Sequence, residues 1–153
     1  MSELKFMLDT NIFNRLLDNR LPLSMIEGKY LITTHIQLDE ISKTPNEIRR
    51  AELESLFKET KQERVPTESS VWDVSRWDNA KWTSEDSKYP EMLARLSELD
   101  KKSKKNAKEP ETNRARDILI AETAIANGIC LITADRNLAT LCTEFGGSVE
   151  TIV

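Results

Sequence analysis

Short apolar runs alternate with helix-like segments along this chain, and this alternation restricts its fold more than any other feature. Apolar runs rich in Ile and Leu are typical of strands that are covered on both faces of a sheet. Strands that alternate with helices predict an α/β fold, in which a mostly parallel central sheet is flanked by helices. The predicted strands cover residues 4–9, 29–33, 128–135 and 147–153.

A helix is predicted shortly after the second strand. Thr44 is a suitable cap residue, and Pro45 fits the first helical position. Glu47 lies three residues after the cap, as in a capping box. The helical period then predicts a buried stripe made of Ile48, Ala51, Leu56 and Phe57.

Two later helices are predicted from the spacing of apolar residues. Residues 115–128 end at the pair Asn127-Gly128, which is a C-terminal helix signal. The apolar positions of this helix are Ile118, Ala121 and Ile125. An earlier helix is expected to use the stripe Met92, Leu93, Leu96 and Leu99.

Length and composition fit a single domain over residues 1–153. The chain is long enough to bury a core, and 39% hydrophobic with 31% charged residues is typical of globular proteins. No apolar run approaches the ~20 residues of a membrane span, and no secretion signal is present. Cys130 and Cys142 are too few for a disulfide framework, and Cys130 is expected in the core in reduced form. We therefore expect a cytoplasmic protein with no membrane partner.

The middle of the chain, about residues 66–111, is polar and has a basic end. Residues 101–116 hold five Lys and two Arg against two Glu, although the net charge of the chain is −4. Such a run is typical of a solvated loop, and the alternative is an edge that contacts phosphates. The middle also contains Trp72, Trp77 and Trp82, which favour packing within a core over stacking on bases.

Acidic residues follow the predicted strands at the same end. Asp9 directly follows the first strand, and Asp135 follows the third in the same way. The carboxyl ends of parallel strands meet at one rim, where ligands bind. Asp39 or Glu40, in a helix after the second strand, also reaches this rim, and periodicity does not decide between them. Asp117 near the start of a helix is the fourth candidate.

Each acid also has a purely structural interpretation. Asp117 can favour the dipole at its helix start, and Asp135 can cap the last helix. Glu122 lies about 140° round the helix from Asp117, so it is expected to point away from that face. Several carboxylates at one rim would repel one another unless a cation neutralised them.

The available ligands favour Mg²⁺ or Mn²⁺ over zinc. Carboxylate oxygens suit these hard ions, whereas the lone His35 and two separated cysteines form no zinc-spaced cluster. No Ser or Cys nucleophile motif, phosphate-binding glycine loop or dinucleotide fingerprint is present. Metal-dependent hydrolysis of a phosphodiester is the chemistry that remains.

Four segments resemble the PIN-domain ribonucleases, which include the VapC-like toxins of toxin–antitoxin pairs. The segments follow the order of that family, and residues 66–111 have no counterpart in it. They are FMLDTNIF (6–13), THIQLDEI (34–41), RDILIAETAIANG (116–128) and LITADRNL (131–138). The resemblance implies a PIN-like α/β fold and a Mg²⁺- or Mn²⁺-dependent endoribonuclease.

The resemblance also implies a role for individual residues. It favours Glu40 over Asp39 and gives the catalytic acids as Asp9, Glu40, Asp117 and Asp135. The metal ligands among them would be Asp9, Asp117 and Asp135, and Asn11 would position Asp9. The basic stretch would hold the RNA backbone through Lys104, Lys105, Arg114 and Arg116.

The resemblance also implies binding partners, and other functions remain as alternatives. An RNA substrate, an antitoxin protein and a homodimer are the partners that the family implies. The alternative function is a non-catalytic module that binds RNA or protein and retains the PIN fold. A phosphoacceptor regulatory domain also places Asp at strand ends, but the late strands offer no Lys to pair with the acids.

Overall fold

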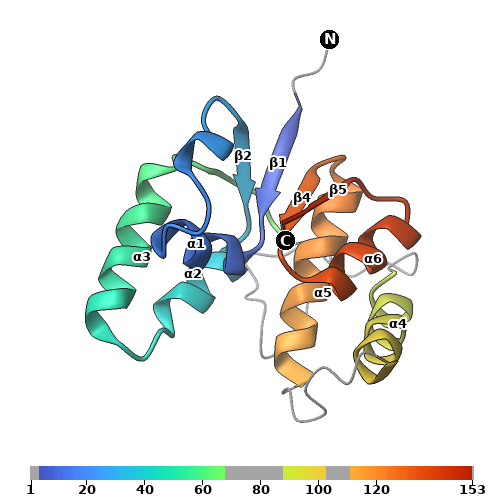
Figure 1. The fold of residues 1–153 in the computed structure, drawn as a ribbon. Helices are drawn as coiled ribbons and strands as arrows, with labels where there is room; N and C mark the ends of the chain where they lie inside the picture. Colours follow the sequence, from blue (N-terminus) through green and yellow to red (C-terminus); the bar gives the residue numbers. More distant parts are fainter. Residues whose placement is uncertain (1–3, 68–87, 103–110, 153) are drawn as a thin grey trace.

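The fold is built on a parallel sheet whose first strand lies in the centre (Figure 1). The computed structural model describes residues 4–67, 88–102 and 111–152. Within these residues five strands form one sheet in the order β3-β2-β1-β4-β5, and all neighbouring strands are parallel. The strands are β1 (Lys5–Leu8), β2 (Tyr30–Thr33), β3 (Glu63–Arg64), β4 (Cys130–Thr133) and β5 (Val149–Thr151). This confirms the predicted α/β class with its parallel sheet.

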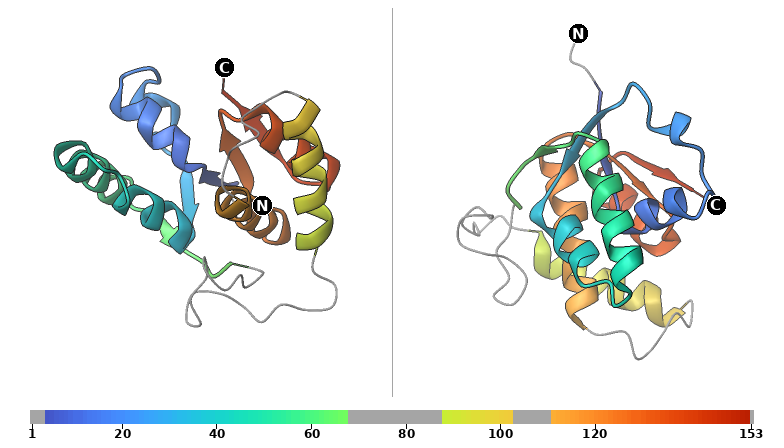
Figure 2. Two further views of the ribbon diagram at one scale, coloured as in Figure 1. Left: turned by 90° about the horizontal axis from the view of Figure 1, so that it is seen from below. Right: turned by 90° about the vertical axis from the view of Figure 1, so that its left-hand side faces the viewer.

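Helices cover both faces of the sheet. α1, α2 and α3 pack against one another on one side, and α4, α5 and α6 do so on the other (Figure 2). A short 3₁₀ helix, η1, covers Leu23–Met25. The α-helices are α1 (Thr10–Leu17), α2 (His35–Ser42), α3 (Glu47–Glu59), α4 (Tyr89–Lys102), α5 (Glu111–Ala126) and α6 (Arg136–Glu144).

Successive strand residues point to opposite faces, and this alternation divides the core into two clusters. One cluster, between the sheet and α4, α5 and α6, contains the strand residues Met7, Ile32 and Leu131. The other, on the side of α1 and α3, contains Leu8, Leu31 and Ile132. The carboxyl ends of β1 and β4 are therefore anchored by buried side chains on both faces.

The buried stripe of α3 differs from its prediction. Leu53 is its fully buried residue, at 1% exposure, and Leu56 and Phe57 are partly buried beside it. Ile48 is 73% exposed and Ala51 is also exposed, so these two predictions are wrong. They lie about 140° and 160° round the helix from Leu53, which turns them away from the core.

The start of α3 also differs from its prediction. The cap is Asn46, whose Oδ1 accepts a hydrogen bond from the Arg49 amide at 3.0 Å. The predicted cap, Thr44, lies two residues earlier, so this prediction is wrong. Asn is as good a cap as Thr, so propensity alone did not separate the two positions.

The later helices match their predictions more closely. In α4, Met92 and Leu96 are buried, and Leu93 and Leu99 pack beside them. α5 begins four residues before the predicted start at residue 115. Both cysteines are free thiols; Cys142 is fully buried, whereas Cys130, expected in the core, is only half-buried.

Two sequence predictions cannot be placed in the structure. Trp72, Trp77 and Trp82, as well as Lys104 and Lys105, lie outside the described residues. In the described part of the chain, no helix combines the length and the apolar character needed to cross a bilayer.

Candidate functional site

Asp9 is the most firmly held carboxylate at the carboxyl rim of the sheet. It follows β1, caps the start of α1 and is 4% exposed. Its Oδ1 accepts from the Thr10 amide at 2.8 Å. Its Oδ2 accepts from Asn11 Nδ2 at 3.1 Å and from Thr133 Oγ1 at 2.7 Å. Three donors thus fix the orientation of one buried carboxylate.

Side chains join the ends of β1 and β4. The Thr133 hydroxyl, fully buried, donates to Asp9 and accepts from the Asp135 amide at 3.0 Å. Asn11 Oδ1 accepts from the Ala134 amide at 3.3 Å. Asn11 therefore contacts Asp9 as a positioning residue would. Sequence reasoning missed Thr133, whose signal was a hydroxyl at the last position of a buried strand.

Glu40, and not its neighbour Asp39, forms a hydrogen bond to the segment that carries Asp9. Glu40 Oε1 accepts from the Thr10 hydroxyl at 2.9 Å, while the Thr10 amide donates to Asp9. Burial, and next the charge of Asp9, raise the pKa of Glu40 to about 7. The Thr10 hydrogen bond opposes this increase, as does the positive charge of Arg116. The carboxylates of Asp9 and Glu40 thus lie close enough to repel each other, at a site that is partly shielded from solvent.

The start of α2 is attached to the end of β1, and this attachment places Glu40. Thr34 caps the helix, and its hydroxyl accepts from the Ile36 amide at 3.1 Å. Gln37 completes the capping box by accepting from the Thr34 amide at 3.0 Å. Gln37 Nε2 also donates to the Leu8 carbonyl at 3.2 Å. The helix is therefore fixed to the residue that precedes Asp9.

Asp135 caps α6 at the same rim, as its structural interpretation predicted. Its Oδ1 accepts from the amides of Asn137 and Leu138 at 3.0 and 3.2 Å. The side chain is half-buried. Capping engages one oxygen of the carboxylate and holds the group next to the end of β4.

Asp117 lies half-buried on α5, which begins beyond the carboxyl edge of the sheet and runs back along it (Figure 1). The preceding residue, Arg116, acts electrostatically on Glu40, so this part of α5 passes the same rim. Glu122, expected to point away from Asp117, is buried at 7% exposure. Among the residues that the structure describes, no three Asp, Glu, His or Cys side chains converge as a metal cluster.

Arg114, which was predicted to contact RNA, is half-buried and paired with an acid of α4. Its Nε donates to Asp100 Oδ2 at 2.9 Å, and the two side chains are 17% and 3% exposed. Asp100 Oδ1 accepts from Asn137 Nδ2 at 2.8 Å. Sequence reasoning did not single out Asp100, although it lies four residues after Leu96 on the buried stripe of α4. A carboxylate on an apolar stripe was the signal.

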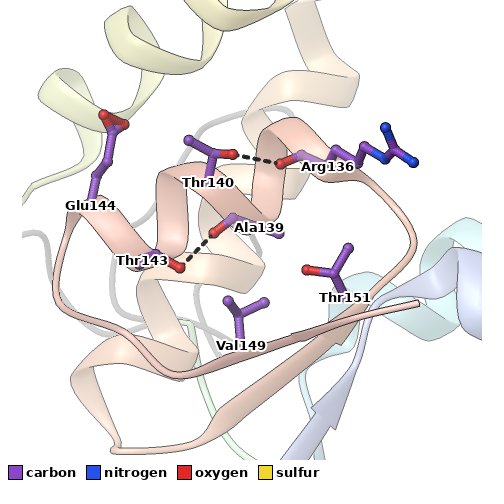
Figure 3. Close-up of a pocket in the computed structure, with 7 residues that line it drawn as sticks. All are labelled: Arg136, Ala139, Thr140, Thr143, Glu144, Val149 and Thr151. Atoms are coloured by element: carbon purple, nitrogen blue, oxygen red, sulfur yellow. Dashed lines mark hydrogen bonds between the residues drawn. The ribbon is translucent and has the colours of Figure 1, made fainter. Parts of the chain in front are cut away.

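A shallow pocket of about 500 Å³ lies between α6 and β5 (Figure 3). Two of its hydroxyls, on Thr140 and Thr143, donate to carbonyls one turn earlier in α6. None of the predicted site residues lines it. Its lining residues are Arg136, Ala139, Thr140, Thr143, Glu144, Val149 and Thr151.

Comparison with known proteins supports the fold. No protein-family model matches the sequence, and no curated protein matches it. Among solved structures, VapBC-1 from nontypeable Haemophilus influenzae has a TM-score of 0.50 at 17% identity, covering 97% of this chain and 98% of that chain. VapBC2 from Rickettsia felis, bound to a promoter DNA fragment, has a TM-score of 0.48 at 16% identity, with coverage of 97% and 98%. VapBC-5 from Mycobacterium tuberculosis has a TM-score of 0.44 at 22% identity and covers 97% of each chain.

At these identities the comparison establishes the fold alone. The similarity to the Haemophilus influenzae structure extends over nearly the whole of both chains. The PIN-like architecture expected from the four sequence segments is thereby confirmed.

Proposed function

We propose that this chain is a Mg²⁺- or Mn²⁺-dependent endoribonuclease that hydrolyses RNA phosphodiester bonds at the carboxyl rim of its sheet. The observation that supports this most is the pair Asp9 and Glu40. Both belong to the rim, Thr10 bonds to both, and Asp9 contributes to raising the pKa of Glu40 to about 7. A carboxylate pair of this kind, with Asp9 buried and Glu40 half-buried, gains stability when a cation neutralises it.

The donor chemistry of the rim fits a hard divalent cation. Carboxylate oxygens suit Mg²⁺ and Mn²⁺, and the residues that would hold the ion are Asp9, Asp117 and Asp135. When bound, such an ion lowers the pKa of a coordinated water and neutralises charge on the phosphodiester. Asn11 and Thr133 keep Asp9 in one orientation.

Glu40 is assigned to proton transfer. Its Oε1 is held by the Thr10 hydroxyl, so the carboxyl group is oriented before substrate arrives. A pKa of about 7 suits a group that takes a proton from an attacking water at neutral pH. The neighbouring positive charge of Arg116 makes it the residue best placed to contact the RNA backbone beside this group.

We assign the remaining backbone contacts to Lys104 and Lys105. Arg114 is left out of this set because its guanidinium is held by Asp100. The resemblance also leads us to propose an antitoxin protein as partner, a homodimer as the assembly and the cytoplasm as the compartment.

The nuclease assignment is tested with purified protein and a mixed pool of end-labelled RNA. Cleavage should require Mg²⁺ or Mn²⁺ and should stop in EDTA. Asp9→Asn and Asp117→Asn should each lower the rate at least ~100-fold, since each removes a charged ligand. Asp39→Asn is the matched control, and its rate should stay within about threefold of wild type. Full metal-dependent activity in both site variants would contradict the proposal.

A non-catalytic scaffold is the second candidate. It is favoured by the finding that the described residues hold no three-ligand metal cluster. A calorimetric titration of Mn²⁺ into wild type and Asp9→Asn distinguishes the two. Binding by wild type that is lost in the variant supports the nuclease, whereas no binding by either protein supports the scaffold.

A further inference from the structure

A buried polar network joins the three helices on one side of the sheet. Asp100 of α4 is 3% exposed, and each of its carboxylate oxygens accepts a hydrogen bond from another described helix. Arg114 Nε of α5 donates to Oδ2 at 2.9 Å, and Asn137 Nδ2 of α6 donates to Oδ1 at 2.8 Å. Within the described part of the chain, the Arg114 guanidinium compensates the charge of Asp100, and the Asn137 amide orients its carboxylate.

The network ends at an acid of the rim. Asn137 donates through its side chain to Asp100 and through its backbone amide to Asp135 Oδ1 at 3.0 Å. The next amide, that of Leu138, donates to the same oxygen at 3.2 Å. Asn137 thus contacts Asp100 through its side chain and Asp135 through its backbone amide, at the start of α6.

Stability alone does not account for this arrangement. A buried ion pair recovers little more than the cost of removing its charges from water, and its best-supported use is to fix a particular geometry. α4 and α6, the helices that carry Asp100 and Asn137, are also joined by an exposed pair, in which Arg95 contacts Glu144 at 2.8 Å. That pair lies at the C-terminal end of α6, whereas Asn137 lies at its start beside the rim.

We infer that Asp100, Arg114 and Asn137 form a positioning network that orients Asp135 at the acidic rim. The inference rests on the proposed function, since it is the role of Asp135 as a metal-binding acid that gives this orientation its use. It also assigns Arg114 a positioning role within the protein.

The positioning itself is tested without metal. Amide hydrogen exchange is measured by NMR in EDTA for wild type, Asn137→Ala and Arg95→Gln. Asn137→Ala leaves the Asp100–Arg114 pair in place, so the chain should stay folded. We expect exchange of the Leu138 amide to accelerate about tenfold in Asn137→Ala and to stay unchanged in Arg95→Gln. Equal exchange rates in all three proteins would overturn the inference.

The consequence for the site is tested with Mn²⁺. We expect Asn137→Ala to raise the calorimetric Kd for Mn²⁺ about tenfold, and to raise the Mn²⁺ concentration for half-maximal cleavage equally. The rate at saturating Mn²⁺ should stay within about threefold, because Asp135 itself is retained. Arg95→Gln should change neither quantity more than twofold.

Failure of the proposed function is distinguishable from failure of the inference. If wild type binds no Mn²⁺, the proposed function fails, and the exchange rates still decide whether the network orients Asp135. If wild type binds Mn²⁺ and Asn137→Ala binds it equally well, the inference is overturned while the nuclease proposal stands. Asp100→Asn provides a second variant, for which we expect the same direction of change in both measurements.

Discussion

At the scale of single residues, Thr10 donates hydrogen bonds to both Asp9 and Glu40, two acids whose charges repel each other. Its amide donates to Asp9 and its hydroxyl to Glu40, so one residue fixes both carboxylates. The hydroxyl also stabilises the charged form of Glu40, and its hydrogen bond lowers a pKa that burial and Asp9 raise. Thr10 therefore sets how readily Glu40 takes up a proton.

Thr10→Val should shift the pH dependence of cleavage. The substitution keeps the amide and the shape of the side chain but removes the hydroxyl, so the pKa of Glu40 rises. A hydrogen bond to a charged group contributes about 1.5–3 kcal/mol to the stability of the charged form. Its loss should therefore move the acid limb of the pH–rate profile about one pH unit or more higher than in wild type. Cleavage rates measured from pH 5 to pH 9 check this. Thr140→Val, which removes an exposed hydroxyl on α6, is the control and should leave the profile unchanged.

At the scale of elements, side-chain caps fix the starts of helices, and the sequence does not always show which residue is the cap. Asn46 caps α3, whereas Thr44 was predicted because Pro45 and Glu47 follow it as in a capping box. Asn46→Ala should lower the free energy of unfolding by about 1 kcal/mol, and Thr44→Ala by less than about 0.5 kcal/mol. Urea unfolding of the two variants provides the comparison, and a larger loss in Thr44→Ala would show that the cap is misassigned.

The elements that the sequence predicted are those with strong apolar periodicity. β1, β2 and β4 are short apolar runs, and α4 carries its stripe at the expected positions. β3 has two exposed charged residues and no apolar signal, so its pairing with β2 could not be predicted. The network at Asp100 escaped prediction because it depends on three helices whose relative placement no local pattern encodes.

At the scale of the whole molecule, the fold gathers acids from distant parts of the chain at one rim. The sequence predicted that Asp9 and Asp135 follow parallel strands and reach the same rim, because that follows from the α/β class. It did not predict that Thr133 and Asn11 would join the two strand ends by hydrogen bonds. Such contacts depend on strand order and register, which apolar periodicity leaves open.

The rim also makes global stability depend on pH. The pKa of Glu40 is about 7 in the folded chain against 4.5 for an ordinary Glu, so between these values the folded state retains a proton that the unfolded state has lost. The free energy of unfolding of the metal-free protein should therefore fall as pH rises from about 4.5 to about 7. The full pKa shift of Glu40 corresponds to a loss of about 3 kcal/mol in the free energy of unfolding. Because Glu40 is partly exposed to solvent, we expect a loss of about 2 kcal/mol.

Glu40→Gln isolates this contribution. The neutral amide cannot ionise, so in EDTA at pH 8 the variant should be about 2 kcal/mol more stable than wild type and nearly equal to it at pH 4. Urea unfolding at both pH values gives the two differences. Asp39→Asn serves as the control, and a Glu40→Gln variant that is less stable than wild type at pH 8 would show that Glu40 is not under electrostatic strain.

The hydrogen bond between Thr133 and Asp9 spans 124 positions in the chain. On the ribosome, at about 5–20 residues per second, Asp9 is made about 6–25 s before Thr133. During that interval β1 lacks its neighbour β4, and of the two donors to Asp9 Oδ2 only Asn11 has been made, while Thr133 does not yet exist. A nascent chain therefore carries the first acid of the rim before its partner Thr133 exists, and the acidic rim is complete only after synthesis has passed β4 and Asp135.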